Sequence, residues 1–178
     1  MIASTELEKQ AALQVAALMA AAARTSPKTR GIDNICVLAI DDEPTKRKLI
    51  AKMREVGQQE KRPSFVRDAG NIETSPAIVV IGVESNPAKL NCGFCGKATC
   101  DELSAAGGVC AFNSIDLGIA VCSAAAVAAR HHVDNRVMYS IGRAVLDLCL
   151  FGANVKQALG LPLSITGKSP FFDRKPFV

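Results

Sequence analysis

The sequence predicts an α/β (α+β) protein of one domain, in which alanine-rich helices flank a mixed β-sheet and a cysteine-rich loop is inserted. Two short apolar runs, residues 35–40 and 77–83, are bounded by polar or turn residues, as expected for buried strands. Alanine-rich segments with helical spacing of apolar residues predict the helices. Because the 178 residues are 49% hydrophobic and 21% charged, we expect residues 1–178 to form one globular domain rather than a disordered chain.

The first half of the chain is expected to run helix, strand, helix. Residues 6–23 are apolar on nearly all sides, so we expect this helix to be buried, in part at the interface of a homodimer. A loop with three cations and three hydroxyl groups, residues 22–31, leads to the strand at 35–40. Acidic residues before Pro44 begin a second helix, which Gly57 ends. Its basic side chains are expected to face solvent: Lys46, Arg47, Lys48, Lys52 and Arg54.

The second half is expected to place the cysteine-rich loop between a strand and a long helix. Residues 58–76 form a polar connection with at most one short element, and the strand at 77–83 then leads into the loop. Asn113 or Ser114 is expected to cap a helix that runs to Arg130. Another helix is expected to start at Asp134 and Asn135 and to stop at Gly152. We expect residues 160–175, rich in glycine and proline, to be an extended tail without regular structure.

Four of the seven cysteines lie in one glycine-rich loop, residues 91–110. Two residues separate the first pair of thiols, a spacing that lets one turn direct two sulfurs at the same metal. Gly93 and Gly96 directly follow these two cysteines, where a chain that wraps an ion needs backbone conformations that a Cβ disfavours. The candidate metal ligands are Cys92, Cys95, Cys100 and Cys110.

The spacing of these thiols favours a 4Fe-4S cluster. Three cysteines fall within nine residues and the fourth stands apart, whereas structural zinc usually takes two separated pairs. Two alternatives stay open: a zinc site, and reduced cysteines with a purely structural role. Outside the loop, we expect Cys36 and Cys149 not to bind metal and Cys122 to pack in the interior.

Composition argues against several classes of partner. The net charge is +4 without an extended basic arm, and the chain has no Trp and one Tyr, so nucleic-acid binding is not expected. We find neither a signal-peptide pattern nor an apolar run that we expect to span a membrane. An odd number of cysteines with metal-like spacing fits a reducing compartment, so we expect the protein to be cytoplasmic.

Two sets of motifs carry resemblances to known families. The stretch NCGFCGKATC resembles the short 4Fe-4S domain of anaerobic electron-transfer and corrinoid proteins, in which cysteines at the positions of Cys92, Cys95, Cys100 and Cys110 are the ligands. This sequence has a shorter gap before the fourth ligand. The chain as a whole resembles an uncharacterised family of ferredoxin-domain proteins (DUF2148-like), through motifs that begin at Asn91, Cys110, Val133 and Gly160.

Outside the loop, the order of motifs resembles the flavin-dependent nitroreductase fold. Residues 22–27, 116–120 and 160–162 stand where that fold has Ala-Ala-Arg-x-x-Pro, Asp-x-Gly-x-Ala and Gly-x-Pro. Proteins of that fold bind FMN at a dimer interface. The resemblance implies that Ser26 lies near the flavin. It also implies that the phosphate of FMN is bound by basic side chains: Arg24, Lys28, and Lys168 or Arg174.

These observations favour a redox protein with one 4Fe-4S cluster, acting in electron transfer or as an oxidoreductase, with FMN as a second cofactor if the fold resemblance extends to it. The alternatives are a sensor or scaffold that responds to gain and loss of the cluster, and a small zinc-stabilised binding protein. The sequence does not identify a redox partner, a small-molecule substrate or a catalytic residue. It has no nucleophile elbow and no phosphate-binding glycine loop of the Walker type.

Overall fold

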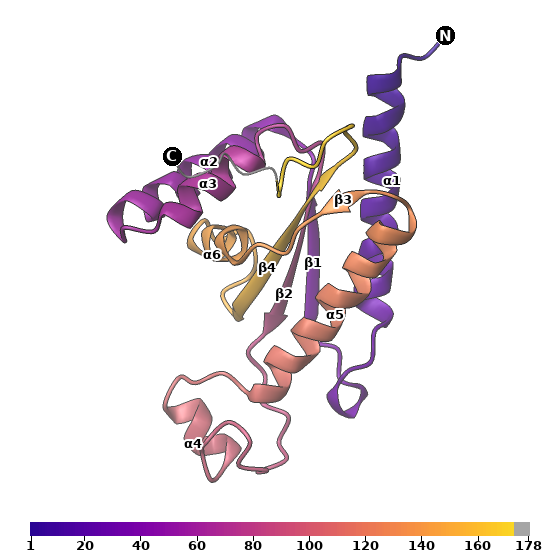
Figure 1. Cartoon of the computed structure of the whole chain (residues 1–178). Coiled ribbons are helices and arrows are strands. Elements are labelled where there is room, and N and C mark those ends of the chain that lie inside the picture. The colour runs from indigo at the N-terminus through magenta and orange to yellow at the C-terminus, as the bar shows by residue number, and fades with distance from the viewer. Residues whose placement is uncertain (173–178) are drawn as a thin grey trace.

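The computed structural model describes residues 1–172 and has three layers, with a β-sheet between two layers of helices (Figure 1). The predicted α/β class is confirmed. Strands in the sheet follow the order β1-β2-β4-β3. Every strand pair in the described part of the chain is antiparallel, so the sheet is antiparallel rather than mixed. The strands are β1 (Ile35–Ile40), β2 (Ile78–Glu84), β3 (Asp134–Asn135) and β4 (Val155–Ser164).

The helices divide between the two faces of the sheet (Figure 1). One face is covered by α1 (Ser4–Thr25) and α5 (Ala111–Arg130), and the other by α2 (Glu43–Gln59), α3 (Pro63–Asn71) and α6 (Tyr139–Asp147). Two short elements lie in connections: the 3-10 turn η1 (Thr29–Gly31) between α1 and β1, and α4 (Cys100–Ala105) within the cysteine-rich loop.

Strand β2 is the centre of the core because it is buried on both faces. Val79 and Ile81 point into the cluster of apolar side chains beneath α1 and α5, whereas Ile78 and Val80 point into the cluster beneath α2 and α6. Burying each such side chain contributes roughly 1.5–3 kcal/mol. This double burial explains the uninterrupted apolar sequence, and it fixes the end of β2 from which the cysteine-rich loop starts.

Helix α1 is buried on one side only, in contrast to the fully buried helix that its composition predicted. Ala12, Ala16 and Met19 face α5 and the sheet, but Leu7 and Leu18 are exposed in the single chain. Small side chains on the buried side let α1 and α5 approach closely, since Ala120 and Ala124 of α5 are fully buried there. Whether a second copy covers the exposed side stays a prediction.

The expectations for residues 134–164 were partly wrong. Asp134 and Asn135 form the short strand β3, and the helix expected to start there begins at Tyr139. The segment expected to be an irregular tail instead contains the end of β4, which pairs with β2 from Val155 to Pro162. Glycine and proline suggested a loop, but pairing with the buried β2 outweighs local propensity. β3 pairs only with Leu163 and Ser164, so it needs no N–H group from Pro162.

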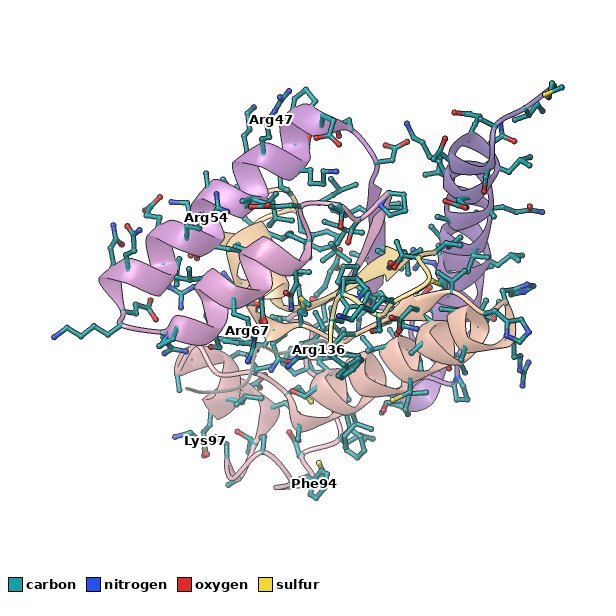
Figure 2. All side chains as sticks on the ribbon, turned by 45° about the horizontal axis from the view of Figure 1, so that its top comes forward. Arg47, Arg54, Arg67, Phe94, Lys97 and Arg136 are labelled. Atoms are coloured by element: carbon teal, nitrogen blue, oxygen red, sulfur yellow. The ribbon has the colours of Figure 1, made fainter. Side chains whose placement is uncertain are left out.

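Two further side chains differ from expectation. Lys46 is buried rather than solvent-facing: its Nζ donates to the backbone oxygen of Ser75 at 3.2 Å and pairs with Glu43. Cys122, expected in the interior, is exposed on α5. Arg47 and Arg54 of α2 are exposed, as predicted (Figure 2).

Helix α5 is long and apolar enough to cross a membrane, which the sequence analysis did not expect. Length and composition alone are weak evidence, because the core helix of a soluble protein meets the same criteria. Here one side of α5 packs against α1 and the sheet, and Leu117, Val121 and Ala128 are buried in the apolar core. Helix α5 therefore contributes one of its sides to the apolar core.

Candidate metal centre

The cysteine-rich loop projects beyond the end of the sheet, beneath the start of α5 (Figure 1). It follows β2 directly, as the sequence predicted. A small apolar cluster of its own holds the loop together: Ala88, Leu103 and Cys110 are buried, and Cys95 and Phe112 pack against them. The loop therefore forms a compact lobe with a separate core rather than an open excursion of the chain.

All four predicted ligands line one small pocket in this lobe: Cys92, Cys95, Cys100 and Cys110. Their exposure differs, since Cys100 and Cys110 are buried, Cys95 is half-buried and Cys92 is exposed. The remaining wall is mostly apolar. No group of three or more His, Cys, Asp or Glu side chains between residues 1 and 172 is arranged to hold a single metal ion. The pocket thus gathers the thiols around a common space without bringing them together at one point.

The backbone of the loop adopts left-handed conformations at the positions where the sequence has glycine or asparagine. Gly93 has φ 72° and Gly96 has φ 81°, and Asn91 has φ 46°. Residues with a Cβ rarely adopt such values, with asparagine a common exception. The N–H of Gly96 donates to the oxygen of Gly93 at 2.9 Å and closes the turn between Cys92 and Cys95. The expected role of both glycines is confirmed.

Hydrogen bonds fix the third and fourth cysteines at the starts of helices. The backbone N–H of Cys100, the first residue of α4, donates to Oδ1 of Asn91 at 2.8 Å. Thr99 caps α4 by accepting from the N–H of Glu102 at 3.1 Å. Cys110 is the N-cap of α5, so it lies at the positive end of a 20-residue helix. A negatively charged group bound by Cys110 would be stabilised there.

These features fit an iron–sulfur cluster better than a single ion. The donor set is thiol only, the turn carries the glycines that a tight wrap requires, and the surroundings are apolar. The rings of Phe94 and Phe112 line the pocket and contact each other at a tilt of 42°, with their centroids 5.6 Å apart. Figure 2 shows Phe94 and Lys97 projecting from the loop at the edge of the molecule, so this side of the site is open to a partner.

The side chains expected to hold a flavin phosphate are used within the chain. Nζ of Lys28 donates to the backbone oxygens of Ala23 at 3.0 Å and Ser26 at 2.8 Å, and also to that of Arg24. The hydroxyl of Ser26 donates to the oxygen of Ala23 at 2.8 Å. Lys28 and Ser26 thus satisfy carbonyl groups at the end of α1, which would otherwise lack donors.

Arg24 is engaged in the same way. Its guanidinium donates to Asp33 at 2.6 Å and to the backbone oxygen of Ile35 at 2.6 Å. Burial alone would raise the pKa of Asp33, but the hydrogen bonds from Arg24 and the Ile35 N–H outweigh it, and so the pKa is lowered. The charges of Arg24 and Lys28 act in the same direction. These residues form a structural network within the chain, and their predicted contacts with a phosphate stay predictions.

Of the other two candidates for the phosphate, only Lys168 lies within the described residues. The hydroxyl of Thr166 donates to the backbone oxygen of Lys168 at 2.6 Å, in the turn after β4. Arg174 lies outside the described residues. The predicted phosphate contacts of Lys168 and Arg174 stay predictions.

Sequence reasoning missed the polar contacts that η1 makes with α5 and with the lobe. The backbone N–H of Thr29 donates to both carboxylate oxygens of Asp116 at 3.1 Å, and its hydroxyl donates to Oδ1 at 2.9 Å. Arg30 donates to the backbone oxygen of Ala88 at 2.8 Å. The sequence analysis used Asp116 only as part of the motif at 116–120, whereas in the structure its side chain anchors η1 to α5. Only the proximity of Asp116 to Cys110 in the sequence hinted at this.

A larger groove opens on the other side of the start of α5. It has a volume of about 540 Å³ and lies between α5, α6 and β4. Val109 of the lobe forms part of its wall, directly before Cys110, and Leu117 and Leu159 add apolar surface. Lys156 and Tyr139 add polar groups. The size is within the range of small-molecule sites.

Comparison with known proteins places the chain in a family. Residues 106–174 match the family model described as "Uncharacterized protein containing a ferredoxin domain (DUF2148)". An uncharacterized protein of Archaeoglobus fulgidus is 41% identical in an alignment that covers 94% of this chain and 95% of the relative. The chain belongs to this ferredoxin-domain family. The resemblance to ferredoxin-domain proteins, predicted from the sequence motifs, is thereby confirmed.

Solved structures show which fold this ferredoxin-domain protein adopts. A nitroreductase with bound FMN from Desulfitobacterium hafniense aligns with a TM-score of 0.61 at 14% identity, covering 100% of this chain and 84% of the other. An iodotyrosine deiodinase bound to FMN and 3-iodo-L-tyrosine aligns with a TM-score of 0.63 at 12% identity, covering 93% and 85%. At such low identity the likeness shows the nitroreductase fold alone.

Proposed function

We propose that the protein is a redox protein that carries one 4Fe-4S cluster on Cys92, Cys95, Cys100 and Cys110. The observation that carries this proposal is the single pocket lined by all four thiols of the Asn-Cys-Gly-x-Cys-Gly loop. Membership in a ferredoxin-domain family supports it, because ferredoxin domains are electron carriers built on thiolate-bound iron and sulfide. A cluster of this kind, when bound, supplies a group that accepts and donates single electrons.

The residues of the lobe would divide the work of holding and tuning such a cluster. Gly93 and Gly96 shape the turn, and Asn91 fixes the start of α4 where Cys100 lies. Burial of Cys100 and Cys110 shields one side from water, which together with hydrogen bonding controls the reduction potential. The exposed side, with Cys92 and Phe94, would face an electron donor or acceptor.

The experiment that tests this function is anaerobic purification with an absorption spectrum and iron, sulfide, zinc and flavin analysis of one sample. About four irons and matching sulfide per chain, with the broad absorption of thiolate-bound iron–sulfur centres, support the proposal. One zinc per chain in a colourless sample would instead favour the zinc-stabilised binding protein. A metal-free sample that keeps its fold would leave the four thiols as structural cysteines.

Matched variants test the ligands. Cys92→Ala and Cys95→Ala are expected to abolish iron binding, whereas Cys36→Ala and Cys149→Ala leave the iron content unchanged. Iron retained at the wild-type level in either of the first two variants would contradict the assignment. Cys110→Ala tests the fourth ligand, which the shortened gap makes the most informative position.

A second candidate is an oxidoreductase that acts on a small molecule, and the groove beside the lobe favours it. Val109 lines this groove and Cys110 lines the thiol pocket, so a molecule in the groove would lie close to the cluster. Two of the structural neighbours, the nitroreductase and the iodotyrosine deiodinase, contain bound FMN. Arg24, Ser26 and Lys28 are engaged inside this chain, and the flavin analysis above decides whether FMN is present.

Two further proposals concern the oligomeric state of the protein and its cellular compartment. The exposed apolar side chains of α1 and α5 favour a homodimer, with a second copy covering Leu18 and Ile119. Reduced cysteines around a cluster favour the cytoplasm. In the sensor or scaffold alternative, the cluster controls assembly instead of taking part in a reaction. Removing the cluster would then change the oligomeric state of a protein that shows no catalytic turnover.

A further inference from the structure

The groove between α5, α6 and β4 has an apolar wall and carries no carboxylate. The two helices lie on either side of β4, and the groove of about 540 Å³ opens between them beside the lobe (Figure 1). Among residues 1–172, no Asp or Glu lines it. Its apolar side chains are Val109, Leu117, Leu146, Ala158 and Leu159. The wall therefore suits the apolar body of an organic molecule, and it offers no negative charge to a cation.

Gly118 is the first sign that a molecule from outside the chain occupies this groove. It lies in the interior of α5, where glycine destabilises a helix relative to alanine. No atom of the described chain lies within 4 Å of the position that a Cβ would take. By contrast, Gly142 of α6 is required by packing within the chain, because a Cβ there would collide with the backbone of Ala158. Since Gly118 lines the groove, its missing side chain leaves room for a flat group against α5.

Lys156 is the second sign, because it brings an unpaired positive charge to the groove. The residue is exposed, lines the groove, and takes part in no hydrogen bond or ion pair within residues 1–172. The other cation of the wall is already offset, since Arg143 pairs with Asp147 and Glu60 at 3.0 Å each. The charge of Lys156 is therefore available to an anion.

Gln157 adds a neutral donor next to this charge. The hydroxyl of Ser114 donates to Oε1 of Gln157 at 2.8 Å, which links α5 to β4 and orients the amide. The Nε2 atom of Gln157 has no acceptor in residues 1–172 and is not buried. On the α6 side, the ring of Tyr139 adds an aromatic surface and is held by the edge-to-face contact with Phe65, at a centroid distance of 5.8 Å.

From these observations we propose that the groove binds a small organic anion, a carboxylate with a flat apolar body. The body would lie against α5 at Gly118, and the carboxylate would pair with Lys156. An ionised carboxylate only accepts hydrogen bonds, which matches the ammonium group of Lys156 and the free Nε2 of Gln157. A groove of this size and lining has the properties of a small-molecule site.

The proposal names the class of molecule for the second candidate function, the oxidoreductase. The role of the carboxylate as a substrate rests on that proposed function, because the groove adjoins the thiol pocket through Val109 and Cys110. Binding of the carboxylate does not require the cluster.

Calorimetric titration of the full-length protein with sodium 1-naphthoate tests the site. We expect saturable binding of one naphthoate per chain. The matched neutral probe 1-naphthamide should bind roughly tenfold more weakly, because it lacks the charge that Lys156 recognises. The cationic probe 1-naphthylmethylammonium should not bind.

Two variants and their matched controls locate the site. Gly118→Leu fills the space against α5 and should abolish naphthoate binding, while leucine favours the helix and so preserves the fold. Gly70→Leu changes another unobstructed glycine, in the last turn of α3, and should bind as the wild type does. Lys156→Gln should weaken naphthoate binding roughly tenfold, to the level of naphthamide. Lys48→Gln, at an exposed lysine of α2, should leave it unchanged.

The proposal is overturned if naphthoate does not bind saturably, if naphthamide binds equally well, or if folded Gly118→Leu or Lys156→Gln binds naphthoate undiminished. Circular dichroism establishes that each variant is folded. A changed mass of Gly118→Leu in light scattering, with no naphthoate binding by the wild type, would assign the glycine to contact with a second copy instead. Iron and sulfide are measured on the same samples. Naphthoate binding without iron would therefore contradict only the cluster, and iron without naphthoate binding only this site.

Discussion

The side-chain oxygen of Asn91 accepts a hydrogen bond of 2.8 Å from the backbone N–H of Cys100. This contact spans the part of the loop that contains Cys92 and Cys95, and it ties both ends of that part together. Asn91 also holds a left-handed conformation, with φ 46°, which asparagine tolerates better than most residues. One side chain thus contributes to the shape of the loop in two ways.

We therefore expect Asn91→Leu to lose iron faster than the wild type when the protein is challenged with a chelator. Loss of the hydrogen bond costs about 1 kcal/mol, roughly a fivefold change in an equilibrium constant, and the left-handed backbone adds a further penalty. Asn91→Asp keeps the acceptor and serves as the matched control. Equal rates of iron release from the wild type and Asn91→Leu would show that the contact does not hold the site together.

The candidate site was largely predictable because its determinants are local. The spacing of four cysteines and the positions of Gly93 and Gly96 lie within 20 residues, and the loop geometry follows from them. The two apolar strands were equally clear, since β2 is buried on both faces. In contrast, β4 was missed because its glycine and proline resemble a loop, and only the pairing with β2 makes it a strand.

The loop between α1 and β1 shows what a local sequence pattern leaves out. A loop with Arg24, Ser26 and Lys28 has the composition of an anion site, but composition does not show that α1 ends there with unpaired carbonyl groups. Lys28 satisfies three of them. The contact of Asp116 was equally beyond reach, because its partner Thr29 lies 87 residues away in the sequence.

The role of Lys28 as a cap predicts its effect on stability. Its side chain is 6% exposed and its Nζ donates to the oxygens of Ala23, Arg24 and Ser26. Lys28→Met is expected to lower the free energy of unfolding by about 1.5–3 kcal/mol in denaturant titrations, because hydrogen bonds from a charged donor are lost. Lys52→Met, which removes a more exposed lysine on α2, should change it by less than about 1 kcal/mol.

The same variant separates a structural lysine from one that binds phosphate. If Lys28 served an anion site, added inorganic phosphate would stabilise the wild type and not Lys28→Met, and the variant without phosphate would be as stable as the wild type. That result would support the predicted phosphate role of this loop.

The pair Arg24 and Asp33 predicts a dependence of stability on pH. The pKa of Asp33 in the folded chain is lowered from its ordinary value of 3.8, because the hydrogen bonds from Arg24 and from the Ile35 N–H outweigh the effect of burial. Below 3.8 the unfolded chain takes up a proton before the folded chain does. The stabilisation by Asp33 is therefore fully present above this value and is lost as the pH falls through the lower, folded pKa.

Asp33→Asn should accordingly be less stable than the wild type at neutral pH, and the difference should shrink as the pH falls below 3.8. Chemical denaturation across the acid range measures it. Asp41→Asn, at an exposed position before α2, controls for the loss of one negative charge. The linkage is refuted if the wild type and Asp33→Asn differ by the same amount at every pH.

The outward side of α5 predicts how the protein assembles. Ile115 is 41% and Ile119 37% exposed, and Leu18 of the neighbouring α1 is 43% exposed, although α5 is apolar enough to pass for a membrane helix. Apolar side chains at helical spacing on two packed helices are costly to leave in water, and a second copy would cover them.

We expect light scattering after size exclusion to give the mass of a dimer for the wild type. Ile119→Glu should shift this mass to that of a folded monomer, because a carboxylate would be buried at the interface without a partner. Gln58→Glu, on the exposed surface of α2, adds the same charge and should remain dimeric. A wild type that is monomeric at micromolar concentration would refute the dimer. The apolar side chains of α5 would then contribute only to the core of the single chain.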